Sequence, residues 1–202
     1  RLGLGNKEAW DTLLDDRVVS MFTDMTSHWA RATVEELARA GVVSGTTAST
    51  FNPNGRITRA EFAALLNRAM KLPEPATRPS FNDVRSGSWY YEDVHRAYAA
   101  GIIAGRSADK FAPAEQITRE EAVTMMMRAL RYKGVKLSDT GTGVKFVDAL
   151  SISEWAKADV NLAAANQLVA GIPSSGGTAF KPRGLTTRAE GAVFVKRLMD
   201  KI

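Results

Sequence analysis

The sequence predicts an all-α fold built from three helix-loop-helix repeats, and two observations carry this prediction. One set of landmarks recurs three times along the 202 residues: Phe-x-Asp, a tryptophan, Phe-x-Pro and Thr-Arg-x-Glu. A helical apolar pattern follows each Thr-Arg-x-Glu box. One such repeat cannot bury its apolar face alone, so we expect the three units to pack into one module. The predicted repeats span residues 22–72, 81–132 and 146–199.

An N-terminal segment, 1–21, precedes the repeats. Four apolar residues in it have roughly helical spacing, which predicts a short helix: Trp10, Leu13, Leu14 and Val18. Charged residues such as Lys7 and Asp11 exclude a signal peptide in this stretch, and we expect the natural protein to be longer at this end. Ile202 closely follows the last predicted helix, so we expect the module to lie at the C-terminus.

The first helix of a repeat is expected at 29–40, where the apolar residues share one face. Gly41 stands where the last helical residue turns left-handed at little cost, and Gly101 does so in repeat two. Gln167 occupies this place in repeat three. We therefore expect a different helix exit there, or some backbone strain.

The loop after the first helix holds a short apolar run, then a glycine, then a polar turn-rich stretch that ends in Phe-x-Pro. This composition predicts irregular structure with one short extended piece. Repeat three has a longer loop through 174–177, so we expect its binding site to differ from the other two. The segments 72–80, rich in proline, and 133–145, rich in glycine, are typical of linkers.

The second helix of each repeat has a defined start. Thr58 lies three residues before Glu61, the spacing of a capping box, and Thr118 and Thr187 begin the same pattern. In repeat one the apolar residues that follow have offsets 0, 3, 4 and 7: Phe62, Leu65, Leu66 and Ala69. This spacing predicts one apolar face of an α-helix.

The composition favours an anionic partner. A net charge of +5 and a pI near 9.6 suit nucleic acid, anionic lipid or anionic glycan, and the basic residues form no tract that would choose among them. The chain has no run of 18 apolar residues, so we expect no membrane insertion. The absence of cysteine excludes disulfides, thiolate catalysis and cysteine zinc sites.

Catalysis and metal binding are not expected. The two histidines, His28 and His95, have no counterpart in repeat three, so we expect packing or surface roles and no metal or cofactor. The pairs Glu35-Glu36 and Glu120-Glu121 are adjacent on predicted helices and point in different directions, which predicts surface positions. Because an acid–base pair needs convergent carboxylates, a glycan hydrolase is disfavoured.

The landmarks together resemble the S-layer homology family, the cell-wall anchoring modules of bacterial surface proteins. The resemblance covers about residues 22–199, and its specificity comes from three boxes such as Ile-Thr-Arg-Ala-Glu at 57–61, each in register with four other landmarks. It implies a pseudo-threefold bundle with three prongs, formed by one chain, in which one helix of each repeat joins the centre and grooves separate neighbouring repeats. It also implies a non-catalytic, noncovalent and multivalent anchor at the extracellular bacterial surface.

The resemblance also implies a partner. Family members bind peptidoglycan-linked secondary cell wall polymers in their grooves, and these glycans often end in pyruvylated N-acetylmannosamine. The pyruvate ketal carries a carboxylate, which fits a basic protein. The alternative is a basic helical nucleic-acid-binding protein, but its recognition helix should concentrate basic residues, whereas helices 59–71 and 119–133 mix charges along their length.

Twelve residues are candidates for ligand binding. Family members use the box arginine, which corresponds to Arg59, Arg119 and Arg188. We expect these arginines to be exposed at the first helical position, beside free backbone amides and the positive helix end, and to be dispensable for folding. The other candidates are the tryptophans (stacking on sugars, or core), the aspartates (ligand contact, or loop staples) and the glycines (close glycan approach, or positive φ): Trp29, Trp89, Trp155, Asp24, Asp83, Asp148, Gly45, Gly105 and Gly171.

Overall fold

A computed structural model describes residues 20–140 and 143–202. The short helix expected in 1–21 falls outside these residues. The all-α prediction is confirmed, with two helices in each repeat: α2 (Arg31–Arg39) and α3 (Arg59–Met70), α4 (Tyr91–Ala99) and α5 (Arg119–Tyr132), α6 (Glu154–Ala165) and α7 (Arg188–Met199). Two 3-10 turns, η1 (Thr23–Met25) and η2 (Ala149–Ser151), precede the first helices of repeats one and three.

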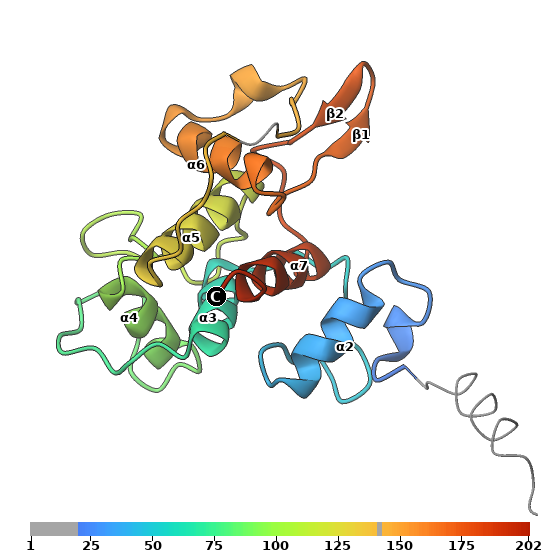
Figure 1. Ribbon diagram of the computed structural model, residues 1–202. Coiled ribbons are helices and arrows are strands. Elements are labelled where there is room, and N and C mark those ends of the chain that lie inside the picture. Colours follow the sequence, from blue (N-terminus) through green and yellow to red (C-terminus); the bar gives the residue numbers. More distant parts are fainter. Residues whose placement is uncertain (1–19, 141–142) are drawn as a thin grey trace, which may run out of the picture.

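The second helices form the centre of the molecule and the first helices form three prongs around it (Figure 1). Helices α3, α5 and α7 pack on one another. Each outer helix packs against the central helix of a different repeat: α2 against α7, α4 against α3, and α6 against α5. The repeats therefore interlock in a cycle, which confirms the pseudo-threefold bundle.

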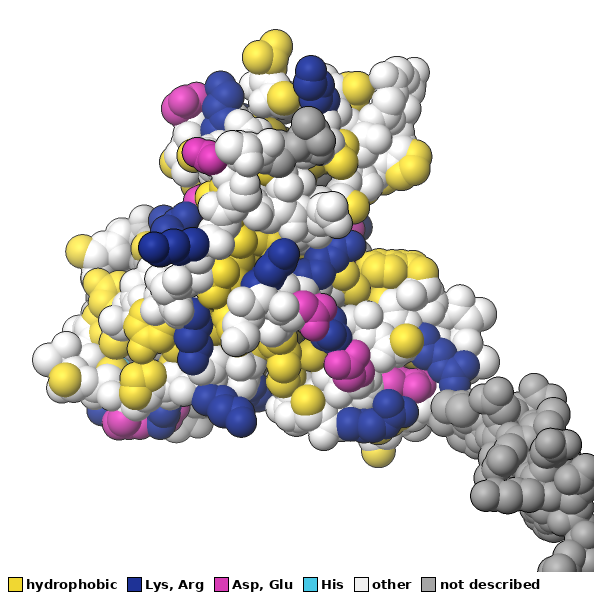
Figure 2. Space-filling model, in the orientation of Figure 1, with side chains coloured by type: hydrophobic (Ala, Val, Ile, Leu, Met, Phe, Trp, Pro, Cys, Tyr) yellow, Lys and Arg dark blue, Asp and Glu magenta, His cyan; other side chains and the backbone are white. Residues whose placement is uncertain are grey.

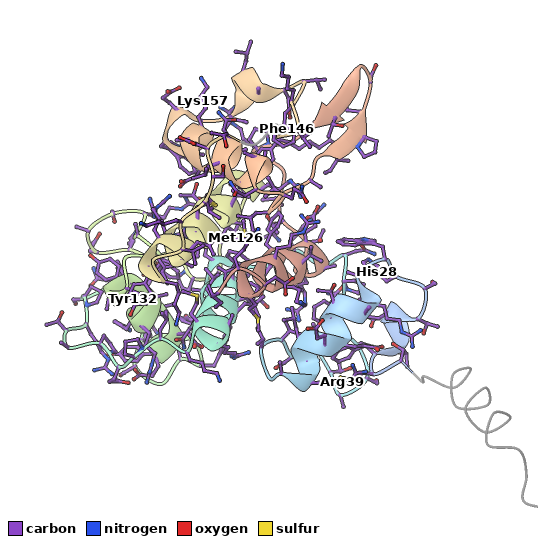
Figure 3. All side chains as sticks on the ribbon, in the orientation of Figure 1. His28, Arg39, Met126, Tyr132, Phe146 and Lys157 are labelled. Atoms are coloured by element: carbon purple, nitrogen blue, oxygen red, sulfur yellow. The ribbon has the colours of Figure 1, made fainter. Side chains whose placement is uncertain are left out.

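Backbone hydrogen bonds close this cycle at the start of the central helices. The Ile57 amide donates to Thr186 O at 3.0 Å, the Thr186 amide to Ile117 O at 2.9 Å, and the Ile117 amide to Ile57 O at 3.1 Å. Each repeat thus donates once and accepts once. Ile57 and Ile117 are buried at this ring, and Figure 3 shows Met126 of α5 among the central helices.

Each prong has its own aromatic pair. The phenylalanine of Phe-x-Asp packs against that of Phe-x-Pro, with ring centroids 5.6, 5.9 and 5.3 Å apart in the three repeats. The pairs are Phe22–Phe51, Phe81–Phe111 and Phe146–Phe180. Figure 3 labels Phe146, which lies in the third prong between α6 and the strands. These pairs fix the loop that joins the two helices of a repeat.

The helix exits and the long third loop differ partly from expectation. Gly41 and Gly101 turn left-handed as predicted, with φ of 71° and 68°, and Gln167 adopts the same conformation with φ of 60°. The exit is therefore the same in all repeats, and repeat three carries the backbone strain of a non-glycine residue. Its longer loop forms an antiparallel hairpin of β1 (Ile172–Ser174) and β2 (Gly177–Ala179). No helix in the described part of the chain is long and apolar enough to cross a bilayer.

Candidate functional site

Three equivalent grooves lie where the prongs meet. Each combines the loop and central helix of one repeat with the tryptophan of the next repeat and the box arginine of the previous one. Groove 1, on repeat one, is lined by Gly45, Arg68, Trp89 and Arg188 among others. Groove 2, on repeat two, is lined by Gly105, Arg128, Trp155 and Arg59. Groove 3, on repeat three, is lined by Gly171, Arg197, Trp29 and Arg119.

The three candidate tryptophans lie on the surface and not in the core. Trp29, Trp89 and Trp155 are 68%, 60% and 57% exposed. Trp29 and Trp89 lie just before the outer helices of their repeats, and Trp155 is the second residue of α6; each lines the groove of the preceding repeat. An exposed indole beside a groove offers a flat apolar face with a polar edge, which suits contact with a sugar ring. Figure 2 shows apolar and basic side chains exposed close together where the three lobes meet.

The prediction that the box arginines are exposed is wrong. Arg59 and Arg119 are 5% and 4% exposed, because each guanidinium reaches across an interface into the neighbouring repeat. Arg119 donates from Nε to Phe180 O at 2.9 Å, from Nη2 to Ala170 O at 3.2 Å and from Nη1 to Glu190 at 2.8 Å. Burial lowers the pKa of Arg119, but an arginine remains charged. These bonds attach repeat two to repeat three.

The same pattern recurs at the other two interfaces. Arg59 donates to the carbonyl oxygens of Phe111 and Ala104 in repeat two, at 3.0 and 2.9 Å. Arg188 donates to those of Phe51 and Ser44 in repeat one, both at 2.9 Å. Each guanidinium also lies over the ring of that phenylalanine, 4.8 Å from its centroid for Arg59 and for Arg188. The box arginines are therefore structural links that also form one wall of each groove.

The expected free amides at the helix starts are also absent. In α3 the Arg59 amide donates to Glu115 O at 2.8 Å, the Ala60 amide to Pro113 O at 3.1 Å, and the Glu61 amide to the Thr58 hydroxyl at 3.2 Å. Helices α5 and α7 have corresponding partners. Since carbonyl oxygens of the next repeat already occupy these donors, the helix starts are not anion sites.

The three capping boxes are confirmed, and their glutamates have a second partner. The Thr58 amide donates to Glu61 Oε2 at 2.7 Å, while Glu61 Oε1 faces Arg188 Nη1 at 3.3 Å. The box of α5 has the same first bond, from Thr118 to Glu121 at 2.9 Å. Burial alone would raise the pKa of the Glu121 carboxyl. The hydrogen bonds that this carboxyl accepts from Thr118 and Arg106 outweigh burial and bring its pKa below the ordinary 4.5.

A second arginine in each groove escaped the sequence analysis. Arg68, Arg128 and Arg197 each follow the box arginine by nine positions and line the same grooves as the exposed tryptophans. Within residues 20–140 and 143–202, Arg68 and Arg128 make no hydrogen bond or ion pair, whereas Arg197 donates to Leu168 O at 3.1 Å. The signal was the repeated nine-residue offset, since an arginine that only faces water has no reason to recur in register.

The candidate aspartates are loop staples. Asp24 accepts from the amides of Phe51 and Asn52 at 2.9 and 2.7 Å, and Asp83 and Asp148 do the same in their repeats. In every repeat the second of these amides belongs to a non-glycine residue with positive φ: Asn52, Ala112 and Lys181. The carboxylate thus holds a strained turn in place. None of the three aspartates is among the residues that line the grooves.

The candidate glycines line the grooves for a steric reason. A Cβ on Gly45 would lie 2.4 Å from Thr47 O and 2.7 Å from a ring carbon of Phe22. Gly105 and Gly171 are equally crowded by their own loops. None of the three glycines has a left-handed φ, so the alternative that a positive φ requires glycine at these positions is wrong. Only glycine permits the tight turn that forms this groove wall.

The prediction that the glutamate pairs Glu35-Glu36 and Glu120-Glu121 lie on the surface is wrong for the first glutamate of each pair. Glu35 and Glu120 are each 4% exposed. Glu120 accepts from the hydroxyl and the amide of Ser153, at 2.8 and 3.0 Å, and so holds the start of α6. Glu35 accepts from the Ser20 hydroxyl at 2.8 Å and the Arg31 Nε at 3.1 Å. Both carboxylates support the fold and do not converge with their sequence neighbours.

The histidines have the packing roles expected of them. His95 is buried, with Nδ1 2.7 Å from Tyr91 O and Nε2 3.1 Å from Pro79 O, so it joins α4 to the linker before it. His28 Nδ1 accepts from the Ala30 amide at 3.2 Å, and its ring lies against Trp29. Neither histidine lines a groove.

Comparison with known proteins identifies the three repeats. The S-layer homology domain matches residues 22–63, 80–123 and 145–192, together more than half of the chain. The chain is 36% identical over 180 residues to the exoglucanase XynX of Acetivibrio thermocellus, covering 89% of the chain and 16% of that protein. It is 34% identical over 176 residues to the surface-layer 125 kDa protein of Lysinibacillus sphaericus, with 87% and 14% covered. It is 29% identical over 171 residues to the S-layer protein sap of Bacillus anthracis, with 84% and 20% covered.

The chain therefore corresponds to a fifth or less of each of these relatives. The comparisons give no support to a nucleic-acid-binding protein. The arrangement of the helices argues the same way, since α3, α5 and α7, which would have to act as recognition helices, are packed together at the centre.

Proposed function

The chain belongs to the S-layer homology domain family, whose members are non-catalytic cell-wall anchoring modules at the bacterial cell surface, and we propose that its three grooves bind a secondary cell wall polymer. The specific ligand in this proposal is a peptidoglycan-linked glycan that ends in pyruvylated N-acetylmannosamine. This ligand combines a sugar ring with a carboxylate. Each groove offers a chemical partner for both parts.

One observation carries the proposal: every groove contains an exposed tryptophan and a second arginine beside the box arginine of the previous repeat. In groove 1, Trp89 offers a face for the sugar ring, and Arg68 offers a guanidinium with no protein partner among the described residues. A guanidinium binds a carboxylate through paired N–H donors, so Arg68 suits the pyruvate group. Trp155 with Arg128 forms the same combination in groove 2.

The box arginines have donors left for a ligand. A guanidinium carries five N–H groups, and the three hydrogen bonds of Arg119 use three of them. We assign the remaining N–H groups of Arg59, Arg119 and Arg188 to direct ligand contact. The loop glycines Gly45, Gly105 and Gly171 carry no side chain and so leave room for the glycan to approach the loop backbone. The aspartates act only as supports of the loop in this proposal.

Attachment by this module is multivalent. Three grooves on one rigid body can engage neighbouring units of the same polymer, and each further contact is intramolecular once the first has formed. Contacts at several grooves then retain the module on the wall more firmly than one groove would alone. The single chain supplies all three grooves, so no oligomer is required.

Co-sedimentation with purified wall sacculi tests the proposal. The chain should pellet with sacculi that carry the polymer and stay in the supernatant when the polymer has been chemically removed. A matched variant with Trp29, Trp89 and Trp155 all changed to alanine should stay in the supernatant with both. Equal pelleting of the unmodified chain with native and stripped sacculi would contradict the proposal.

A further inference from the structure

Groove 2 contains a buried hydroxyl that the other grooves lack. Thr124 of α5 lines this groove and is 4% exposed, and its Oγ1 has no hydrogen-bond partner among the described residues. The corresponding positions are Ala64 in groove 1 and Val193 in groove 3. An unpaired buried hydroxyl lowers stability, so its presence at a groove floor points to a partner that arrives from the groove. Threonine populates two χ1 rotamers in a helix, and rotation between them moves the hydroxyl to a new direction.

Groove 2 also leaves one arginine donor unused. In groove 3, Arg119 Nη1 lies 2.8 Å from Glu190 Oε1, and in groove 1 the corresponding contact of Arg188 with Glu61 is 3.3 Å. In groove 2, Arg59 Nη1 lies 3.6 Å from Glu121 Oε1, beyond hydrogen-bond distance.

The cause is Arg106. It follows Gly105 in the loop, where the other repeats have Thr46 and Ile172. Arg106 donates from Nη1 to Glu121 Oε1, the same oxygen that Arg59 would otherwise bind, and from Nε to Glu115 at 2.8 Å. Arg106 therefore occupies the acceptor and leaves Arg59 Nη1 with both hydrogens.

We propose that groove 2 is the high-affinity groove of the module, and that the Thr124 hydroxyl and Arg59 Nη1 form a polar subsite for the carboxylate of the glycan. This inference rests on the proposed function and deepens it. Both groups donate to a carboxylate oxygen, and Arg128, which has no partner among the described residues, adds positive charge to the same groove. Arg106 is a positioning residue, because it acts through Glu121 and Arg59.

Groove 3 is the weakest by the same reasoning. It has Ile172 in place of Arg106 and Val193 in place of Thr124. Its second arginine, Arg197, already donates to Leu168 O at 3.1 Å. Groove 1 is intermediate, because Arg68 is unpaired among the described residues but Ala64 supplies no hydroxyl.

Calorimetric titration of the whole chain with a methyl glycoside of pyruvylated N-acetylmannosamine tests the inference, with the unmodified sugar as a second probe. The unmodified chain should show one tight site for the pyruvylated probe. Thr124→Val should weaken this site about tenfold, as expected for one lost hydrogen bond to a charged group. It should change binding of the unmodified sugar much less. Valine at the equivalent position 193 shows that the groove tolerates this side chain.

Two further variants complete the test. Thr124→Ser keeps the hydroxyl and should retain affinity within about twofold of the unmodified chain. Arg106→Thr places the residue of repeat one at this position and frees Glu121 to accept a hydrogen bond from Arg59. This variant should weaken binding of the pyruvylated probe only. An unchanged tight site in both Thr124→Val and Arg106→Thr would overturn the inference while the proposed function stands. Failure of the unmodified chain to bind both the probe and polymer-bearing sacculi would overturn both.

Discussion

Arg188, at the start of the last helix, donates its Nε hydrogen to the carbonyl oxygen of Phe51 in the first repeat at 2.9 Å, across 137 positions of sequence. The guanidinium also lies over the Phe51 ring, 4.8 Å from the centroid. This contact closes the cycle of three repeats, because it joins repeat three to repeat one, as the packing of α2 on α7 also does. In the proposed function, recognition of the ligand and cohesion of the module therefore depend on the same side chains.

Loss of a box arginine should destabilise the module. Arg119→Ala removes three hydrogen bonds and leaves Glu190 without its ion-pair partner, so the free energy of unfolding should fall by about 3 kcal/mol. Arg119→Lys should lower the free energy of unfolding by a smaller amount, because the lysine ammonium keeps the charge but cannot reproduce the branched N–H donors of the guanidinium. Denaturant unfolding measures both. The matched control is Arg68→Ala, which removes an arginine with no partner among the described residues and should change stability by less than about 0.5 kcal/mol. Equal stability of Arg119→Ala and Arg68→Ala would refute the structural role.

Two adjacent threonines should respond in opposite directions. Thr186 is fully buried and its hydroxyl has no partner in the described part of the chain, while the other repeats have Ile57 and Ile117 at this position. Thr186→Val should therefore raise the unfolding free energy by about 1 kcal/mol. Thr187→Val removes the cap on Glu190 and should lower it by roughly 0.5–2 kcal/mol. Calorimetric melting of both variants would decide the matter, and two shifts of the same sign would contradict this account.

Glu121 should make stability depend on acid pH. Its folded pKa lies below the ordinary 4.5, so the unfolded chain binds its proton first as pH falls. The stabilising contribution is present above about pH 4.5 and is lost as pH falls through the lower folded pKa. Glu121→Gln should be less stable than the unmodified chain at pH 7 and should approach it in stability below pH 4. Parallel curves for the two proteins between pH 7 and pH 3 would show that Glu121 does not contribute.

The second arginines should affect binding without affecting folding. Arg128→Ala should weaken binding of the pyruvylated glycoside in groove 2, because it removes a cation whose guanidinium is unpaired among the described residues. The melting temperature should stay within a degree or two of the unmodified chain, since no described hydrogen bond is lost. Titration calorimetry combined with a melting curve measures both. Lower stability with unchanged affinity would mean that Arg128 supports the fold and does not contact the ligand.

The sequence was sufficient to predict the features of each repeat that depend on neighbouring residues. The capping boxes, the left-handed exits at Gly41 and Gly101 and the helical apolar faces all depend on residues a few positions apart. The error over the box arginines arose because their partners lie in another repeat, 52 positions away for Arg59 and Phe111, and no local pattern reveals that distance. The cyclic order of the repeats likewise depends on packing between units, so the composition of each groove from three repeats was visible only in the structure.

Two-dimensional ¹H–¹⁵N spectra of the tryptophan indoles test most directly whether the grooves bind the ligand. The chain has four tryptophans, and single Trp→Phe variants would assign their signals. On titration with the methyl glycoside of pyruvylated N-acetylmannosamine, the signal of Trp155 in groove 2 should shift first, followed by Trp89 and then Trp29, while Trp10 should not respond. Binding to polymer-bearing sacculi with no shift of Trp29, Trp89 or Trp155 would place the ligand outside the grooves and contradict the account.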